Sequence, residues 1–153
     1  MDRIRNLNPD EIYDQAVTIN SQSIKYHDRP ISNIVFMGMG EPFLNYRNVI
    51  KSAKILNDKK GFNISVNKIT ISTVGIVSKI KQFINDNEQF GLAISLNAPN
   101  DKINAISEIL PVLKSPTVLP LNKEGWSSLH SVINENTFWE VIDKIKDAGA
   151  EDI

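Results

Sequence analysis

The hydrophobic residues of this chain follow two spacings, one typical of strands and the other typical of helices. Short apolar runs that are rich in β-branched residues predict three strands, at residues 33–38, 68–74 and 91–96. Apolar residues three or four positions apart predict helices after them, on Val49, Ile50, Ala53 and Leu56, on Ile80, Phe83 and Ile84, and on Ile103, Ile106 and Leu110. Strands that alternate with helices in this way favour an α/β fold with a parallel sheet.

A further helix is predicted before the first strand. Asn8 can cap its start, Pro9 suits the first helical position, and Glu11 completes a capping box. Apolar residues at helical spacing extend this helix from about Pro9 to Ser23, and the polar segment from Tyr26 to Pro30 predicts a break. His27 is therefore expected to be a surface loop residue.

The first strand leads into the stretch that carries the candidate chemistry. It is expected to be buried and to end in Gly38, Gly40, Glu41 and Pro42, where glycines allow a sharp turn and a close approach to a ligand. All three predicted strands end in small or polar groups: Gly40 with Glu41, Ser72 with Thr73, and Ser95 with Asn97. Since the carboxyl ends of parallel strands meet at one edge, these groups predict a ligand pocket there. The alternative is an ordinary turn with a solvated glutamate.

Beyond residue 110 the pattern changes. Residues 127–133 alternate as in a strand, and Thr137 opens a helix with one apolar stripe, formed by Phe138, Val141, Ile142 and Ile145. The next strand is expected where the sequence ends, so this segment is expected to be an incomplete domain with open edges that favour self-association. His130 is interpreted as a strand-surface residue rather than a ligand, and Trp126 and Trp139 as packing residues.

Composition narrows the classes of function. The chain has 153 residues, of which 41% are apolar and 23% are charged, as in globular proteins. A net charge of −1 argues against an autonomous RNA-binding protein. The absence of cysteine excludes disulfides, thiolate metal sites and a cysteine-ligated iron–sulfur cluster. No apolar run is as long as a membrane span and the start is unlike a signal peptide, so a cytoplasmic location is expected.

The segments Arg5-Asn6-Leu7, Asn33 to Pro42, Ile69 to Gly75 and Leu92 to Asp101 together resemble one family over about residues 3–101. It is the radical SAM methyltransferase family that methylates carbon 2 of an adenine in ribosomal and transfer RNA. The resemblance implies a partial TIM-like barrel with S-adenosylmethionine across its strand ends. It implies cofactor contacts by these residues: Gly40, Glu41, Ser72, Ser95, Leu96 and Asn97. The family usually has histidine in place of Asn97.

The resemblance also brings out a difference. In the family, three cysteines that hold an iron–sulfur cluster lie just before the Arg-Asn-Leu segment, whereas this sequence has Met1 there and no cysteine anywhere. The cysteines that carry and resolve the methyl group are missing as well. Without a cluster no electron reaches the sulfonium of the cofactor. We therefore expect at most residual S-adenosylmethionine binding, no iron–sulfur cluster, no methyl transfer and no RNA partner.

A second resemblance covers about residues 97–153. Residues 109–121 with Ser115-Pro116-Thr117-Val118, Glu124-Gly125-Trp126 and Phe138-Trp139 resemble the C-terminal part of long-form ATP phosphoribosyltransferase. This family implies a ferredoxin-like regulatory domain that binds histidine. The expected organisation is a (βα) barrel fragment at residues 1–101 and an incomplete ferredoxin-like segment at residues 102–153. Three interpretations remain open: an inactive methyltransferase relative, a regulatory binding module, or a recombined or engineered scaffold without activity.

Overall fold

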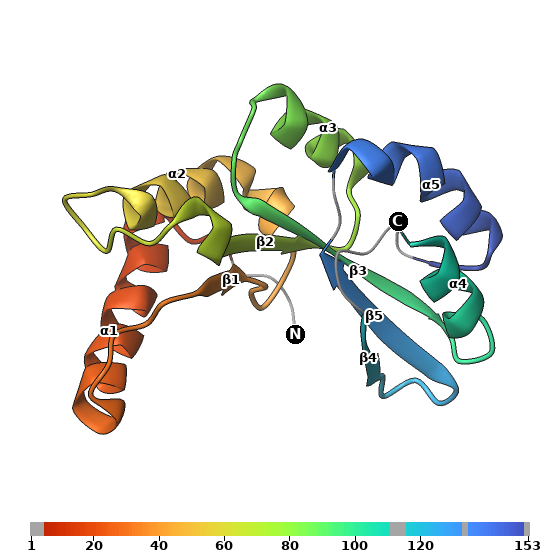
Figure 1. Ribbon diagram of the computed structural model, residues 1–153, viewed down its shortest axis with the longest axis horizontal. Helices are drawn as coiled ribbons and strands as arrows, with labels where there is room; N and C mark the ends of the chain where they lie inside the picture. Colours follow the sequence, from red (N-terminus) through yellow and green to blue (C-terminus); the bar gives the residue numbers. More distant parts are fainter. Residues whose placement is uncertain (1–4, 111–115, 133–134, 152–153) are drawn as a thin grey trace. The chain divides into compact units, whose positions relative to one another are not determined.

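A computed structural model describes residues 5–110, 116–132 and 135–151, with the backbone alone for residues 135–139. The chain divides into two compact units, which are described separately. Unit 1 contains the chain up to Ile71 together with Gln89–Gly91, and unit 2 contains Ser72–Glu88 and the chain from Leu92 onward. Figure 1 shows the course of the chain through the elements of both units.

Unit 1 consists of two long helices and two parallel strands. Its elements are α1 (Pro9–His27), β1 (Ile34–Phe36), the short 3-10 helix η1 (Pro42–Asn45), α2 (Tyr46–Asn57), the 3-10 helix η2 (Val66–Lys68) and the first part of β2 (Ile69–Thr73). Helices α1 and α2 contact each other (Figure 1). Strand β1 is parallel to β2, with Ile34 opposite Ile69 and Phe36 opposite Ile71. The predicted parallel pairing is therefore confirmed for these two strands.

Helix α1 begins as the sequence predicts. The Asn8 side chain accepts a hydrogen bond from the Glu11 backbone amide at 2.9 Å, and the Glu11 carboxylate accepts one from the Asn8 amide at 2.9 Å. The helix is longer than expected, because it continues through Tyr26 to His27. It ends at Asp28, which adopts a left-handed conformation with φ 53°. The predicted break was thus two residues too early, since exposed polar side chains do not by themselves end a helix.

The core of unit 1 lies between α2, η1 and the inner face of β2. Its fully buried side chains include Phe43, Ala53, Ile69 and Ile71. Strand β1 is less buried than predicted: its three residues alternate between half-buried and exposed, and Val35 is 55% exposed. The prediction of a buried strand is wrong because β1 is at the edge of the strand order and only one of its faces packs inward.

Unit 2 combines helices with strands that include antiparallel pairs. Its elements are the end of β2, α3 (Val77–Asn85), β3 (Gly91–Pro99), α4 (Ile103–Ile109), β4 (Thr117–Pro120), β5 (Trp126–Val132) and α5 (Glu135–Asp147). In this unit the strand order is β2-β3-β5-β4, with β5 antiparallel to both β3 and β4. Strand β4 was not predicted, because all four of its residues are exposed and give no alternation. Helix α5 begins two residues before Thr137, which therefore lies inside the helix.

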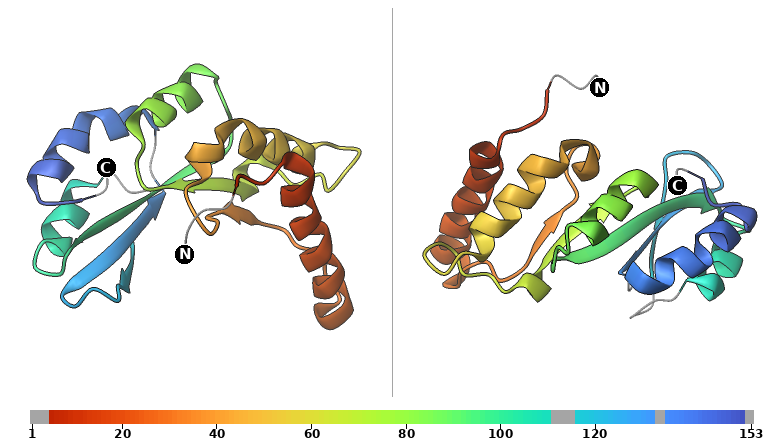
Figure 2. Two further views of the ribbon diagram at one scale, coloured as in Figure 1. Left: turned by 180° about the vertical axis from the view of Figure 1, so that it is seen from behind. Right: turned by 90° about the horizontal axis from the view of Figure 1, so that it is seen from above.

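The two faces of the β3–β5 pair differ in character. Leu96 faces Leu129 across the pair, and both are almost completely buried. Helices α4 and α5 lie on one side of these strands and contribute the buried Ile106 and Ile145 (Figure 2). The opposite face carries Ser95 and His130 in register, and we call it the open face of unit 2. After α5, the Glu151 amide donates to the Asn97 carbonyl at 2.8 Å in an antiparallel bridge, where the sequence predicts a next strand.

These observations confirm the predicted fold class. The structure is mixed α/β, with parallel strands in the barrel-like part and a βαββα order from β3 to α5, as in an incomplete ferredoxin-like segment. The sheet is mixed rather than wholly parallel, because β5 pairs with β3 in the antiparallel direction. Within the described residues, no helix is both long and apolar enough to cross a membrane.

Candidate functional site

The turn after β1 is held by main-chain geometry and by one carboxylate. Gly38 and Gly40 have φ values of 60° and 146°, which favour glycine strongly. The Glu41 carboxylate accepts a hydrogen bond from the Phe43 amide at 2.8 Å and so caps η1. Pro42 occupies the first position of this short helix and is buried. Glu41 therefore has a structural role, and its carboxylate is held in a defined orientation.

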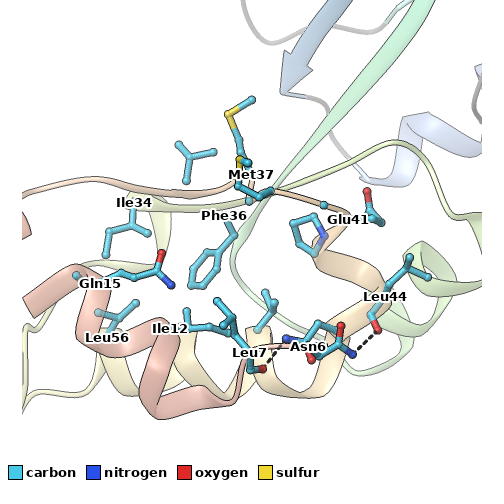
Figure 3. Close-up of a pocket in the computed structure, with 18 of the residues that line it drawn as sticks. Asn6, Leu7, Ile12, Gln15, Ile34, Phe36, Met37, Glu41, Leu44 and Leu56 are labelled. Atoms are coloured by element: carbon cyan, nitrogen blue, oxygen red, sulfur yellow. Dashed lines mark hydrogen bonds between the residues drawn. The ribbon is translucent and has the colours of Figure 1, made fainter. Parts of the chain in front are cut away.

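This turn forms one end of a pocket of about 470 Å³ in unit 1. Figure 3 shows Ile34 and Phe36 pointing from β1 toward Ile12 and Leu56, whereas Met37 points to the other side of the strand. Glu41 lies at the end of the pocket away from Ile34 (Figure 3). A volume of this size is typical of small-molecule sites.

The segment before α1 closes another side of the same pocket. The Asn45 and Asn48 side-chain amides both donate to the Leu7 carbonyl, at 2.8 and 2.9 Å. The Asn6 side chain donates in turn to the Leu44 carbonyl at 3.4 Å (Figure 3). These bonds tie residues 6–7 to η1 and α2, so the residues of the Arg-Asn-Leu motif line the pocket together with the Gly38–Pro42 turn. An apolar floor with one carboxylate at its end suits a ligand that has an apolar part and a cationic group.

In unit 2, hydrogen bonds connect the predicted site residues Ser72 and Ser95 to His130 and Ser128, which were not predicted as site residues. The Ser72 and Ser95 hydroxyls are 3.2 Å apart, and the Ser95 hydroxyl is 2.7 Å from Nδ1 of His130. The Ser128 hydroxyl is 3.1 Å from Nε2 of the same ring. Partial burial lowers the pKa of His130 from its usual value. His130 does lie on a strand surface, but sequence reasoning missed its hydrogen bonds because they depend on the register between β3 and β5.

The remaining predicted residues lie in different surroundings. Leu96 points into the core of unit 2 and is 1% exposed, so only its backbone is on the side of Ser95. Asn97 shares the open face with Ser95, and its carbonyl accepts from Glu151. Ser95 and Asn97 are inside β3 rather than at its end, because the strand continues to Pro99. Gly40 and Glu41 belong to unit 1 and the other four to unit 2, and the cofactor contacts of all six stay a prediction.

The donor set does not fit an iron–sulfur cluster. The sequence contains no cysteine, so no thiolate is available to ligate iron. Within the described residues, no group of three or more histidine, aspartate, glutamate or cysteine side chains is arranged to hold a metal ion.

Comparisons with known proteins show that the chain is similar to members of two families. Residues 91–153 match the family model "HisG, C-terminal domain". The chain is 48% identical over 109 residues to the probable dual-specificity RNA methyltransferase RlmN of Christiangramia forsetii, and 49% identical over 110 residues to that of Dictyoglomus thermophilum. These alignments cover 71% and 72% of the chain, but only 30% and 31% of the two relatives. The chain thus spans less than a third of the length of either relative.

A solved structure gives the same relationship. The structure resembles that of a radical SAM methyltransferase from Sphaerobacter thermophilus with a TM-score of 0.58 and 38% sequence identity, over 67% of this chain and 30% of that one. Only 90 residues precede Gly91, so an RlmN alignment of 109 residues extends into the segment matched by the HisG model. Both resemblances inferred from the sequence are confirmed: most of the chain is related to radical SAM methyltransferases, and residues 91–153 are related to the C-terminal domain of HisG.

Proposed function

We propose that this chain is a cytoplasmic S-adenosylmethionine-binding relative of the RNA methyltransferases that performs no methyl transfer itself. The observation that carries the proposal is the pocket of unit 1, in which an apolar floor ends at Gly40 and Glu41. The overlap of two family similarities supports the further proposal that the chain is a chimera of methyltransferase and HisG-like sequence.

The chemistry of the pocket matches the parts of this cofactor. S-adenosylmethionine carries an ammonium group, a sulfonium and an aromatic base. The Glu41 carboxylate would hold the ammonium group through a charge-assisted hydrogen bond. Its bond with the Phe43 amide fixes its orientation before binding, which reduces the ordering cost. The apolar side chains of Ile34 and Phe36 would contact the less polar parts of the ligand.

Calorimetric titration with S-adenosylmethionine tests the binding site. Glu41→Gln keeps an oxygen that can cap η1 but removes the charge, so binding should weaken by about 1.5–3 kcal/mol, or roughly 10- to 150-fold. Asp14→Asn is the matched control, because it removes one carboxylate from an exposed position of α1 outside the pocket. Equal affinity in wild type and Glu41→Gln would exclude the proposed role of Glu41, and no binding at all would exclude the proposal.

Anaerobic reconstitution with iron and sulfide tests the proposed lack of activity. We expect no stoichiometric cluster in visible absorption and iron analysis, because the chain offers no thiolate ligand. Methyl transfer to ribosomal RNA should then be undetectable as well. A protein-bound cluster that supports reduction of the cofactor would contradict this part of the proposal, whereas cofactor binding would be unaffected by that result.

A second candidate function rests on the HisG-like segment. The βαββα order of residues 91–147 supports a regulatory-type module that binds histidine. Adding histidine in the same calorimetric experiment separates this candidate from the first. We also propose that the exposed edge strands β1 and β4 favour self-association, which sedimentation over a range of concentrations tests.

A further inference from the structure

Four polar side chains form a continuous hydrogen-bonded row on the open face of unit 2. They are Ser72 on β2, Ser95 on β3, and His130 and Ser128 on β5, with successive separations of 3.2, 2.7 and 3.1 Å. Ser95 and His130 are directly opposite each other in the β3–β5 register, so the pair is fixed by the backbone pairing of two strands. Ser72 and Ser128 are buried, whereas Ser95 and His130 are only half-buried and can be reached from solvent.

Both neutral tautomers of His130 can satisfy this row, and one of them makes the ring an acceptor for Ser95. With its proton on Nε2, the ring donates to Ser128 and accepts from the Ser95 hydroxyl through Nδ1. The Ser72 hydroxyl can then donate to the Ser95 oxygen. A hydroxyl that donates to a neutral imidazole, whose second nitrogen is oriented by a third group, is the arrangement that activates serine nucleophiles.

We propose that Ser95 is a nucleophile that accepts acyl groups from activated esters, with His130 as its general base and Ser128 as a positioning residue. The proposal is independent of S-adenosylmethionine binding in unit 1. Both residues lie within residues 91–153, which match the HisG C-terminal domain, but the proposal rests on their contact and not on either family similarity.

The reaction balances without an oxidant or a metal. The Ser95 oxygen attacks the carbonyl carbon of the ester, and its proton passes to Nδ1 of His130. The bond between this carbon and the leaving oxygen then breaks, and the leaving group departs as an anion or takes the proton from the imidazolium. Water subsequently attacks the acyl-serine with His130 as base, which releases the carboxylic acid and restores the Ser95 hydroxyl.

The test uses the full chain and p-nitrophenyl acetate. We expect a burst of p-nitrophenolate that is stoichiometric with protein, and peptide mapping should locate the acetyl group on Ser95. Ser95→Ala should abolish the burst, and His130→Gln should slow it by about 100-fold or more, the usual contribution of a general base. His27→Gln is the matched control, because His27 is the other histidine of the chain and is exposed on α1.

Two further measurements distinguish the loss of the Ser95 nucleophile from misfolding of a variant. The acetylated residue of the wild-type chain is identified without any variant, so acetyl groups found on lysines or on His27 but not on Ser95 would overturn the proposal. Ser95→Thr keeps a hydroxyl at the same strand position and should retain part of the burst, whereas Ser95→Ala should not. A burst of equal size and rate in wild type and Ser95→Ala would also overturn it.

The pH profile tests the role of His130. Only the neutral imidazole accepts the proton, so the acylation rate should rise with pH and level off once His130 is deprotonated. Burial lowers the pKa of His130, so this plateau should begin at a lower pH than for an ordinary histidine. The cross-strand neighbours, Ser95 on β3 and Thr117 on β4, carry no charge, and neither does Ser128. Ser128→Ala should shift the profile, which a purely structural role of Ser128 would not do.

Discussion

Glu41 at the cap of η1 in unit 1 and His130 on β5 in unit 2 are both polar side chains of candidate sites, but they are held in different ways. Glu41 bonds to the backbone amide of Phe43, only two residues later in the chain. His130 bonds to Ser95, which is 35 residues away, and its position depends on the pairing of two strands. A local bond of the first kind can be inferred from a short motif, whereas a bond of the second kind requires the register of the sheet.

Because of this difference, Glu41 and His130 should respond differently to substitutions elsewhere in the protein. Glu41 stays oriented as long as the Gly38–Pro42 turn and η1 are formed, because its partner lies in the same turn. The row from Ser72 to Ser128 depends on β2, β3 and β5 together. Perturbing the core beneath each group therefore offers the strongest test of the comparison.

The largest loss of stability is expected when a buried side chain next to each site is shortened to alanine. Phe43 and Leu129 are both 0% exposed; Phe43 directly follows the Gly38–Pro42 turn, and Leu129 directly precedes His130. Phe43→Ala should destabilise by about 3–5 kcal/mol and Leu129→Ala by about 2–5 kcal/mol, through lost burial and the cavity that remains. Urea denaturation measures both values. Chemical shifts of the His130 ring should change in Leu129→Ala, and a variant that costs less than about 1 kcal/mol would show that its site is not supported by this core.

Sequence reasoning succeeded where the signal was local. The capping box of Asn8 and Glu11, the strands β2 and β3 and the stripe that includes Ile142 and Ile145 all followed from spacing, because each depends on residues a few positions apart. The capping role proposed for Thr137 failed, since helix α5 begins at Glu135, and the side chain of Phe138 lies outside the described residues.

Sequence reasoning failed where the pairing of strands that are distant in the chain determines the structure. Strand β4 is exposed at every position, so no periodicity marked it, and the edge position of β1 could not be read from its apolar composition. For the candidate site, the sequence placed Ser95 and Asn97 at the end of a strand, whereas both lie inside β3, which continues to Pro99. The contact between Ser95 and His130 needed the β3–β5 register, in which Leu96 facing Leu129 would have been the usable clue.

An intermediate effect is expected at two glycines, one in each unit. Gly40 and Gly125 have φ values of 146° and 75°, and an added Cβ would meet no atom within 4 Å at either. Backbone strain alone therefore sets the cost of substitution. Gly40→Ala should cost about 1–3 kcal/mol because its conformation is nearly exclusive to glycine, whereas Gly125→Ala should cost about 1 kcal/mol as an ordinary left-handed residue. Thermal unfolding of both variants checks the order, and a larger loss for Gly125→Ala would contradict it.

The smallest effect on stability is expected at the start of α1, where the Glu11 carboxylate titrates. The Arg5 guanidinium and the Asn8 amide hydrogen-bond to Glu11 and lower its pKa to about 2, from an ordinary value of 4.5. Because the folded pKa is the lower one, the stabilisation is complete above about pH 4.5 and is lost as the pH falls toward 2. The Glu11 side chain is partly exposed, so salt should weaken the effect.

Amide exchange of residues 10–13 between pH 6 and pH 2, after correction for the intrinsic rate, measures this loss at the helix start. Glu11→Gln should remove the pH dependence there and leave the exchange of β3 and β5 unchanged, because the Arg5–Glu11 pair and the capping box are confined to residues 5–11. Asp14→Asn serves as the control, since Asp14 is exposed on the same helix and lies outside the capping box. A pH dependence that survives in Glu11→Gln would mean that another group near the start of α1 titrates on folding, and the local account of this helix would then be wrong.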